Sequence, residues 1–433
     1  MKTRNVIVIF LFLALTAWIY PSDDNILYVS IATGKNTNPG TKDQPLKNID
    51  KAINMAEPGG KIYIAGGVYM GTFNIGYIEC NKPVKLYGSF SPDFSTRDIK
   101  KHPTLFQPDN ASGARSRKAL IQFTGDVDGL VIDGIVFDMG MRNCYHTVDG
   151  KPAGVETGML LLPPEKQTGQ IPTVTEPCLS IPSASKGGEI LIQNNVFINS
   201  ASFGIQAGLR QGSLKVLNNV FIANRMAAVE IYGTCPSTGG PKTLSLCGEV
   251  EIAYNTILFS WSRTKDLLDM GYGVRVMTKL KYNIHHNIIA GNTLAGVDHT
   301  RFNKNEWVTV DNNIFFANKA ADMEYSPASN TKLNLKLDQF GDLEIASCTG
   351  NKGDIPKSLP IDKPYLEGFL NARYSEQADY NPNSPANLFR EAMGLNKQGK
   401  LVTSVTMFGN RYPCKKAIEV FGSVSGFGAQ GFK

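Results

Sequence analysis

Hydrophobic and polar positions recur along this 433-residue chain as pairs of short apolar strands separated by small polar bends. Five segments share this pattern, and each carries an asparagine between two apolar stretches. These asparagines are 24, 36, 32 and 26 residues apart: Asn195, Asn219, Asn255, Asn287 and Asn313. A period in the mid-twenties with irregular insertions is typical of a parallel β-solenoid, in which each coil buries its apolar face against its neighbours.

The recurring asparagine has a physical explanation at a corner of such a coil. Its short side chain tolerates a left-handed bend, and stacked amides can form hydrogen bonds from one coil to the next. We therefore predict an all-β protein, a single right-handed parallel β-helix. Its coils are expected over residues 111–326, with inserted loops at 142–186, 235–247 and 261–272.

The N-terminal segment has the pattern of a secretory signal. Lys2 and Arg4 precede an apolar run from Val6 to Ile19 that is short for a membrane span. We assign residues 1–20 to a signal peptide, with an uncleaved N-terminal anchor as the alternative. The expected location is secreted, periplasmic or at the cell surface, with no membrane span after the signal is removed.

Residues 21–110 are expected to form an N-terminal cap and the first coils. Between Leu46 and Ala56 the apolar residues follow helical spacing, which predicts one apolar helix face able to plug the open end of a solenoid. Residues 327–433 are less regular. We expect them to form a C-terminal extension that closes the solenoid.

Seven cysteines in an exported chain indicate disulfides with one thiol left over. Cys235 and Cys247 bracket a Pro/Ser/Gly insertion and are expected to staple it. Further pairs could be Cys144 with Cys178 and Cys348 with Cys414, which would leave Cys80 free. Several buried free thiols are the alternative.

Charge limits the classes of partner. Lys and Arg number 44 against 38 Asp and Glu, giving a formal charge of +6. This balance is compatible with an acidic glycan but is too weak to indicate nucleic acid, since no basic run accompanies it. We expect a monomer with a polysaccharide or oligosaccharide as its partner.

Segments near both ends resemble a known superfamily. The N-terminal ones are Tyr28-Val29-Ser30, Asn38-Pro39-Gly40-Thr41, Pro58-Gly59-Gly60, Gly66-Gly67-Val68-Tyr69 and Leu86-Tyr87-Gly88-Ser89-Phe90; the C-terminal ones are Asp379-Tyr380-Asn381-Pro382, Phe408-Gly409-Asn410-Arg411 and Gly426-Phe427-Gly428-Ala429. Together they are similar to right-handed parallel β-helix proteins of the pectate-lyase-like superfamily, exported bacterial members in particular. The resemblance implies a scaffold shared by lyases, hydrolases, epimerases and non-enzymes, so it does not select a reaction.

Aligning the second strand of each coil predicts a column of polar residues on the outer surface. Ile205, Val229, Val274, Val297 and Met323 are expected to point inward, because side chains alternate along a strand. The residue after each then points outward, which gives the column Gln206, Glu230, Arg275, Asp298 and Glu324. Neighbouring members should be about 4.8 Å apart.

This column suggests a glycan-processing centre made of Glu230, Arg275 and Asp298. The backbones of the two carboxylates would be about 9.5 Å apart, which suits an inverting glycoside hydrolase. Under a lyase mechanism Arg275 would neutralise a uronate, and Lys279, Lys281 or His299 would remove the proton next to it. The carboxylates could also bind Ca²⁺.

Other residues are candidates for substrate binding. Tyr232, Trp261 and Tyr272 could form a wall for stacking sugars, since aromatic faces pack on apolar sugar faces. Gln206, Lys279, His299, Arg301 and Glu324 complete the predicted substrate-binding set. A metal site at His285-His286 lacks an evident third ligand.

Two alternatives stay open from the sequence. The outward column could be a solvated ladder of cross-strand charge pairs, as on many exposed sheets. The protein could equally be a non-catalytic surface or adhesion solenoid that binds a glycan. The leading hypothesis is an exported polysaccharide lyase or glycoside hydrolase.

Overall fold

The structure, a computed structural model, describes residues 25–69, 78–107, 119–140, 177–184, 188–237, 244–261, 270–301, 303–327, 331–371, 381–398 and 411–432. The predicted signal peptide lies outside these residues. So does most of the predicted insertion at 142–186 and the centre of the one at 261–272.

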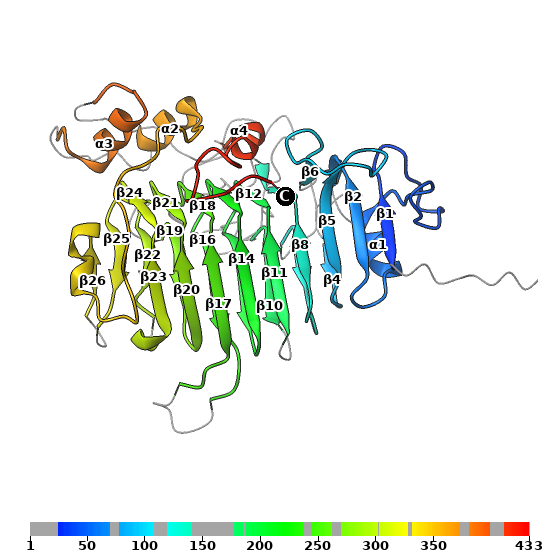
Figure 1. Ribbon diagram of the computed structural model, residues 1–433, viewed down its shortest axis with the longest axis horizontal. Coiled ribbons are helices and arrows are strands. Elements are labelled where there is room, and N and C mark those ends of the chain that lie inside the picture. Colours follow the sequence, from blue (N-terminus) through cyan, green and yellow to red (C-terminus); the bar gives the residue numbers. More distant parts are fainter. Residues whose placement is uncertain are drawn as a thin grey trace, which may run out of the picture.

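Three long sheets, named A, B and C here, form the body of the molecule (Figure 1). Sheet A contains β1 (Ile26–Val29), β2 (Lys61–Ala65), β5 (Lys85–Phe90), β8 (Val131–Asp133), β11 (Glu189–Gln193), β14 (Ser213–Leu217), β17 (Gly248–Ala253), β20 (Leu280–His285) and β23 (Val308–Asp311). Sheet B contains β3 (Gly67–Tyr69), β6 (Thr104–Phe106), β9 (Ile135–Asp138), β12 (Val196–Ile198), β15 (Val220–Ile222), β18 (Thr256–Leu258), β21 (Ile288–Ala290) and β24 (Ile314–Phe316).

Sheet C contains β4 (Ile78–Cys80), β7 (Ile121–Phe123), β10 (Leu179–Ala184), β13 (Phe203–Leu209), β16 (Ala227–Gly233), β19 (Tyr272–Val276), β22 (Ala295–His299), β25 (Ala321–Tyr325) and β26 (Leu333–Leu335). Among the described strands all pairings are parallel except that of β26 with β25. The chain visits A, B and C in turn, so each circuit is one coil. This confirms the predicted single parallel β-helix.

The helices lie outside the sheets: α1 (Ile49–Met55), α2 (Lys363–Phe369), α3 (Pro385–Ala392) and α4 (Cys414–Ile418), with 3₁₀ turns η4 (Asn305–Trp307) and η5 (Leu337–Asp342). Helix α1 falls where the apolar spacing predicts a helix, and Ile49, Ala52 and Ile53 are buried in the main core. Its role as a cap stays a prediction. None of the helices in the described ranges is long and apolar enough to cross a membrane.

The asparagines predicted from the repeat form a continuous hydrogen-bonded ladder at the corner between sheets A and B. Each side-chain amide donates to the side-chain oxygen of the asparagine one coil further on, at 2.9–3.1 Å from Asn195 to Asn313. Asn351 extends the ladder by one step, accepting from Asn313 at 3.2 Å. The ladder satisfies buried amides that a corner would otherwise leave unpaired.

One detail of this corner differs from our expectation. The left-handed backbone belongs to the residue before each ladder asparagine, namely Asn194, Asn218, Tyr254, His286 and Asn312, with φ between 54° and 57°. The ladder asparagine can therefore turn its side chain inward, because the bend is completed one residue earlier.

A second polar ladder, which the sequence did not reveal, lies at the corner between sheets B and C. The backbone amide of Ser260 donates to Asn292 at 3.0 Å, and the side chain of Asn292 donates to Asn318 at 2.8 Å. The residue before each of these corner residues also has a left-handed φ, as at Phe259 and Ala317. Irregular residue types hide this repeat from sequence inspection.

The C-terminal extension returns along the outside of sheet B instead of continuing the coils. In Figure 1 it runs from orange to red beside the strands of sheet B, and α4 packs on β12 and β15. Outward residues of sheet B such as Val196, Val220 and Ile288 share one buried cluster with Phe389 and Tyr412 of the extension. All three positions of a strand such as β12 are buried because sheet B is covered on both faces.

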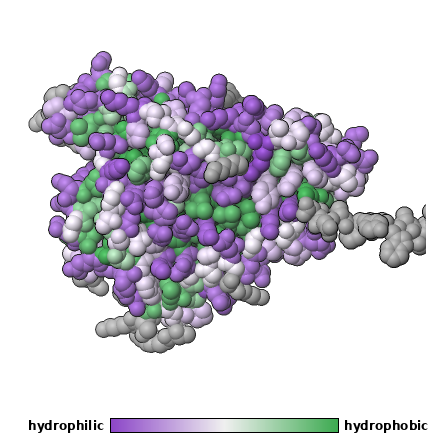
Figure 2. Space-filling view, viewed as in Figure 1, coloured by the Kyte–Doolittle hydropathy of each residue, from purple (hydrophilic) through white to green (hydrophobic). Residues whose placement is uncertain are grey.

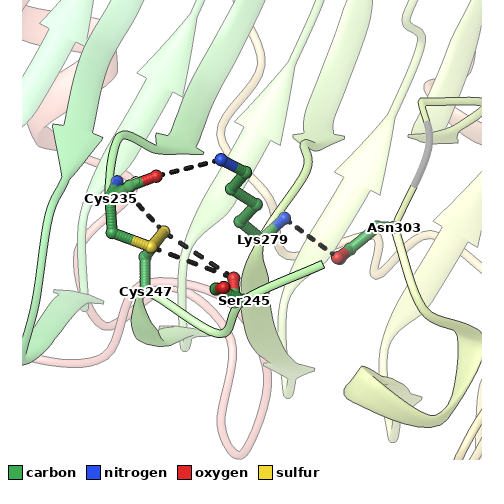
Figure 3. The surroundings of a disulfide bond; sticks show 5 residues. All are labelled: Cys235, Ser245, Cys247, Lys279 and Asn303. Carbon is green, nitrogen blue, oxygen red and sulfur yellow. Dashed lines mark hydrogen bonds between the residues drawn. A yellow bond between two sulfur atoms is a disulfide. The ribbon is translucent and has the colours of Figure 1, made fainter. Parts of the chain in front are cut away.

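The cysteines match the sequence expectation in part. Cys235 and Cys247 form a disulfide between β16 and β17, with Lys279 Nζ donating to the Cys235 carbonyl at 2.9 Å (Figure 3). Cys80 is free, as expected. Cys178 is also free and buried, and its suggested partner Cys144 lies outside the described residues.

The suggested Cys348–Cys414 disulfide is wrong, since both thiols are free. Cys348 stays beside β23, whose Thr309 bridges Ser347. Cys414 begins α4, which the returning extension carries back to β12 and β15. Disulfide formation needs Cα atoms within about 7 Å, and this path separates the two residues by several coils.

Candidate functional site

The register of sheet C produces the predicted outward column. Glu230 of β16 pairs with Gln206 of β13 on one side and Arg275 of β19 on the other. Arg275 pairs in turn with Asp298 of β22, and Asp298 with Glu324 of β25. The inward neighbours of these residues, such as Val229 and Val274, are fully buried in the main core. The alternation rule therefore placed five side chains correctly over five coils.

Arg275 joins the two carboxylates into one ion-paired group. Its Nη1 contacts Glu230 Oε2, and its Nε donates to Asp298 Oδ2 at 2.9 Å. Gln206 Nε2 donates to the second oxygen of Glu230 at 2.8 Å. Thr300 donates to Asp298 Oδ1 through its hydroxyl at 2.6 Å and its backbone amide at 3.0 Å. All four carboxylate oxygens are thus engaged.

The ion-paired group is buried although it lies outside the solenoid core. Glu230, Arg275 and Asp298 are 6%, 5% and 0% exposed. Burial opposes the charge of Arg275, but the neighbouring Asp298 and Glu230 more than compensate and raise its pKa. Because desolvating an ion costs several kcal/mol, a buried group of this kind persists only when it is paired as completely as here.

Tyr272 and Glu324 continue the group along the sheet. The Tyr272 ring lies 5.3 Å from the Arg275 guanidinium, and its hydroxyl donates to Glu324 Oε2 at 2.9 Å. Lys332 Nζ lies 2.6 Å from the other oxygen of Glu324. Burial, together with the charges of Asp298 and Glu324, raises the pKa of Tyr272 well above its usual range. Tyr272 therefore remains a neutral hydroxyl.

The outer faces of the three sheets differ in kind. Sheet B is apolar and covered by the C-terminal extension. Sheet A carries exposed charge pairs such as Lys281 with Glu249 at 3.2 Å. Figure 2 shows hydrophilic and hydrophobic residues interspersed over the view taken in Figure 1. On sheet C the charged outward side chains are almost completely buried, so the solvated-ladder alternative does not describe Glu230, Arg275 and Asp298.

Two residues predicted near the centre are structural instead. His299 points inward, is 1% exposed, and pairs its Nε2 with Asn305 Oδ1 at 3.1 Å. Trp261 is 1% exposed in the cluster beneath the C-terminal extension, with its Nε1 donating to the Ala223 carbonyl at 3.2 Å. Trp261 therefore cannot form the predicted sugar-stacking wall in this structure.

The remaining candidates lie at different distances from Arg275. Tyr232 is half-buried, and burial together with Glu230 raises its pKa. Lys279 occupies a left-handed turn at the disulfide (Figure 3). Lys281 lies on β20 of sheet A. Arg301 is exposed beyond the end of β22. The lysines predicted as bases for elimination are thus not beside Arg275.

Metal binding finds little support within the described ranges. They contain no group of three or more His, Cys, Asp or Glu side chains that could hold a metal ion. His285 instead pairs its Nε2 with Glu251 Oε1 at 3.2 Å. The four oxygens of Glu230 and Asp298, two of the carboxylates proposed as Ca²⁺ ligands, are already engaged by Arg275, Gln206 and Thr300.

Sequence reasoning missed two hollows on the outside of sheet A. One, of about 420 Å³, lies over β14, β17 and β20 and is lined by Lys215, Glu249 and Lys281 among others. The other, of about 510 Å³, lies at the corner between sheets A and B and is lined in part by Tyr254 and Glu251. The available signal was Tyr254, an aromatic residue at a corner position where three coils carry asparagine.

The chain is similar in part to known proteins. A family model described as a protein of unknown function (DUF1565) matches residues 32–126. Curated protein sequences give no match. The fold itself is a parallel β-helix of three sheets.

Similar solved structures include pectate lyase Pel9A, with 13% identity, a TM-score of 0.39, and coverage of 88% of this chain and 89% of that one. A rhamnogalacturonan lyase has 14% identity, a TM-score of 0.37, and coverage of 87% and 96%. A GH136 lacto-N-biosidase from Eubacterium ramulus has 12% identity, a TM-score of 0.30, and coverage of 76% and 55%. Similarity at this level does not extend to the reaction or the substrate.

Proposed function

We propose that this chain is an exported, glycan-directed β-helix that binds a polysaccharide across the outer face of sheet C and cleaves it by hydrolysis. The observation that carries this proposal is the buried, ion-paired group of Glu230, Arg275 and Asp298 outside the solenoid core. Burying three ions costs free energy, and a face with only a structural role has no need of them.

Hydrolysis fits the charges better than elimination does. A lyase would need Arg275 to bind a uronate carboxylate, but Glu230 and Asp298 already neutralise it and leave a net negative charge on the three side chains. Of the three expected bases, Lys279 and Lys281 lie elsewhere, and His299 points into the core. On strand spacing the backbones of Glu230 and Asp298 are about 9.5 Å apart, and inverting hydrolases hold their two carboxyl groups about 6.5–9.5 Å apart.

The same charges favour a neutral glycan. Arg275 Nη2 makes no hydrogen bond within the described ranges, so it remains a donor for a sugar hydroxyl. In this mechanism the glycan displaces Arg275 from one carboxylate. The carboxylate released from Arg275 takes up a proton from solvent and gives it to the leaving oxygen, while the other, still ionised, accepts a proton from the attacking water.

A second candidate is a binder that performs no chemistry. The observation in its favour is that all four oxygens of Glu230 and Asp298 are engaged by Arg275, Gln206 and Thr300. Such complete pairing is what a rigid polar platform requires.

Amide variants of the two carboxylates separate these candidates. Purified wild type, Glu230→Gln and Asp298→Asn are incubated with neutral and acidic polysaccharides, with and without Ca²⁺. New reducing ends and the ultraviolet absorbance of unsaturated products are followed together. We expect the wild type to release reducing ends from a neutral glycan without absorbance, and each variant to lose at least about 100-fold in rate.

Glu249→Gln, on the exposed face of sheet A, is the matched control and should keep full activity. Circular dichroism and thermal melting show whether each variant is folded. Absorbance appearing with the reducing ends would contradict hydrolysis and establish elimination. Binding without product formation would support the second candidate, a non-catalytic binder. If the folded protein neither binds nor cleaves any of the glycans, the proposal is wrong.

A further inference from the structure

The corner hollow between sheets A and B has the chemical character of a sugar site. Its volume of about 510 Å³ lies within the usual range for small-molecule pockets. Four amide side chains line it, from Gln193, Asn194, Asn218 and Gln430. Leu217 adds an apolar surface and Tyr254 an aromatic one.

Tyr254 occupies a backbone position that disfavours it. Its φ is 56°, in the left-handed region where the corner residues two coils before and two coils after are Asn194 and Asn312. A bulky residue there is a conformational outlier, and such outliers concentrate at functional sites. Asparagine would suit the corner better, so the ring needs another explanation.

The ring of Tyr254 is held as a platform. One face stacks on His286 of the next coil, with centroids 4.9 Å apart and planes 20° from parallel. His286 in turn lies 5.9 Å from Phe427 of the C-terminal extension. Because His286 follows Tyr254 along the corner and Asn218 precedes it, the second face of the ring is directed toward the hollow.

The polar groups of the hollow are fixed before any ligand arrives. Asn218 Nδ2 donates to Asn194 Oδ1 at 2.6 Å, and Asn194 Nδ2 donates to Asp133 at 2.9 Å. Gln430 is held by its own backbone amide, which donates to Asn218 Oδ1 at 2.5 Å. A preorganised lining loses little entropy when it binds.

Several groups remain available for hydroxyls. Within the described ranges the hydroxyl of Tyr254, Oε1 of Gln193 and Oε2 of Glu251 make no hydrogen bond, while Glu251 Oε1 pairs with His285 at 3.2 Å. Glu251 is the charged residue of the lining, which includes no Lys or Arg from the described part of the chain. The described lining therefore offers an anionic ligand no cationic side chain.

We infer that this hollow is a second binding site for a neutral sugar ring, which stacks on Tyr254 and donates hydroxyl hydrogen bonds to Glu251 and Gln193. It lies on a different face from the proposed centre on sheet C and does not depend on it. An aromatic platform with amide and carboxylate partners matches a sugar, which has an apolar face and a hydroxyl rim.

Saturation-transfer NMR with neutral hexasaccharides of cellulose, xylan, mannan and chitin tests this inference. The wild type should give saturation transfer to at least one of them. Tyr254→Asn installs the residue that the corner prefers, so its melting temperature should equal or exceed that of the wild type. Its binding should fall roughly tenfold or more through loss of the stacked ring.

Glu249→Gln is the matched control, since Glu249 lies on the exposed face of sheet A and does not line this hollow. It should retain most of the binding. No transfer to any hexasaccharide, or transfer unchanged in Tyr254→Asn, would overturn the second site.

The corner site and the proposed centre on sheet C are tested by different variants, so either proposal can be wrong without the other. Binding that Glu230→Gln and Asp298→Asn leave intact but Tyr254→Asn removes supports the corner site whatever the outcome of the cleavage assay. Binding removed by the sheet C variants and retained by Tyr254→Asn assigns the sugar to sheet C and contradicts the corner site.

Discussion

At the scale of single residues, the side chains of neighbours on one strand point to opposite faces of the sheet. Asp298 points outward into an ion pair with Arg275, whereas His299 points into the core beside the Tyr325 ring, with centroids 5.6 Å apart. Both side chains are buried, so their solvent exposure does not distinguish them. The alternation along β22 does, because it assigns each side chain to one face of the sheet.

The inward position of His299 predicts a contribution to pH dependence. Burial lowers its pKa, although the hydrogen bond with Asn305 opposes this. As the pH falls through about 6.5, the unfolded chain gains a proton at His299 that the folded protein resists, so stability falls until the folded pKa is reached. His299→Gln should reduce this loss by up to about 1.4 kcal/mol for each pH unit in that window.

Urea unfolding of wild type and His299→Gln at pH 7.5 and 5.5 measures this effect. At pH 7.5 the difference in unfolding free energy between the two proteins comes only from packing and hydrogen bonding. The change in that difference between pH 7.5 and pH 5.5 measures the effect of protonating His299. Parallel pH dependences for the two proteins would show that His299 does not contribute.

At the scale of elements, the ladder at the corner between sheets A and B holds successive coils together. Asn255 Oδ1 accepts from the backbone amide and side chain of Asn219, at 2.9 and 3.1 Å. Its Nδ2 donates to the Val216 carbonyl at 2.8 Å and to Asn287 at 3.0 Å. One side chain thus forms hydrogen bonds with three residues of the two neighbouring coils.

Removing an asparagine from the middle of the ladder should destabilise the protein. In Asn255→Ala the buried amide of Asn219 and the carbonyl of Val216 lose their partner, so we expect unfolding free energy to fall by roughly 2–4 kcal/mol. Asn283→Ala, an exposed asparagine on β20, should change it by less than about 0.5 kcal/mol. Urea denaturation compares the two, and equal losses would contradict a structural ladder.

At the scale of the whole molecule, the C-terminal extension completes the fold by covering sheet B. Contacts such as that of the Tyr412 backbone amide with Asn199 Oδ1, at 2.6 Å, join residues 213 positions apart in sequence. Phe389 is fully buried between Phe259 of the β-helix and Phe316, with ring centroids 5.6 and 5.4 Å away. The extension therefore belongs to the core.

Two adjacent residues of α3 test this role. Phe389→Ala should lower the unfolding free energy by about 3–5 kcal/mol, since it empties a buried aromatic site under the extension. Leu388→Ala, whose side chain is 38% exposed, should lower it by less than about 1 kcal/mol. Chemical denaturation and binding of a hydrophobic dye would report the exposure of sheet B, and similar values for both variants would contradict a tightly packed extension.

The predictable parts of the molecule share one property. Asn195 to Asn313 and the column from Gln206 to Glu324 recur in similar local contexts, so periodicity alone aligns them. The Cys348–Cys414 pairing, the sugar-stacking role of Trp261 and the placement of lysines near Arg275 had no such periodicity. They depended on how the insertions and the C-terminal extension are routed, which sequence spacing does not encode.

The sequence by itself determined the coil repeat, the ladder at the corner between sheets A and B, and the inward or outward direction of each strand residue, because stacking and the twofold alternation of strands are local rules. The tertiary structure alone decided what covers each outward face. It buried Glu230, Arg275 and Asp298, placed the extension on sheet B, and left the Tyr254 hollow open. Burial depends on contacts between residues far apart in the chain, and for that reason the character of each face emerged only when the chain was folded.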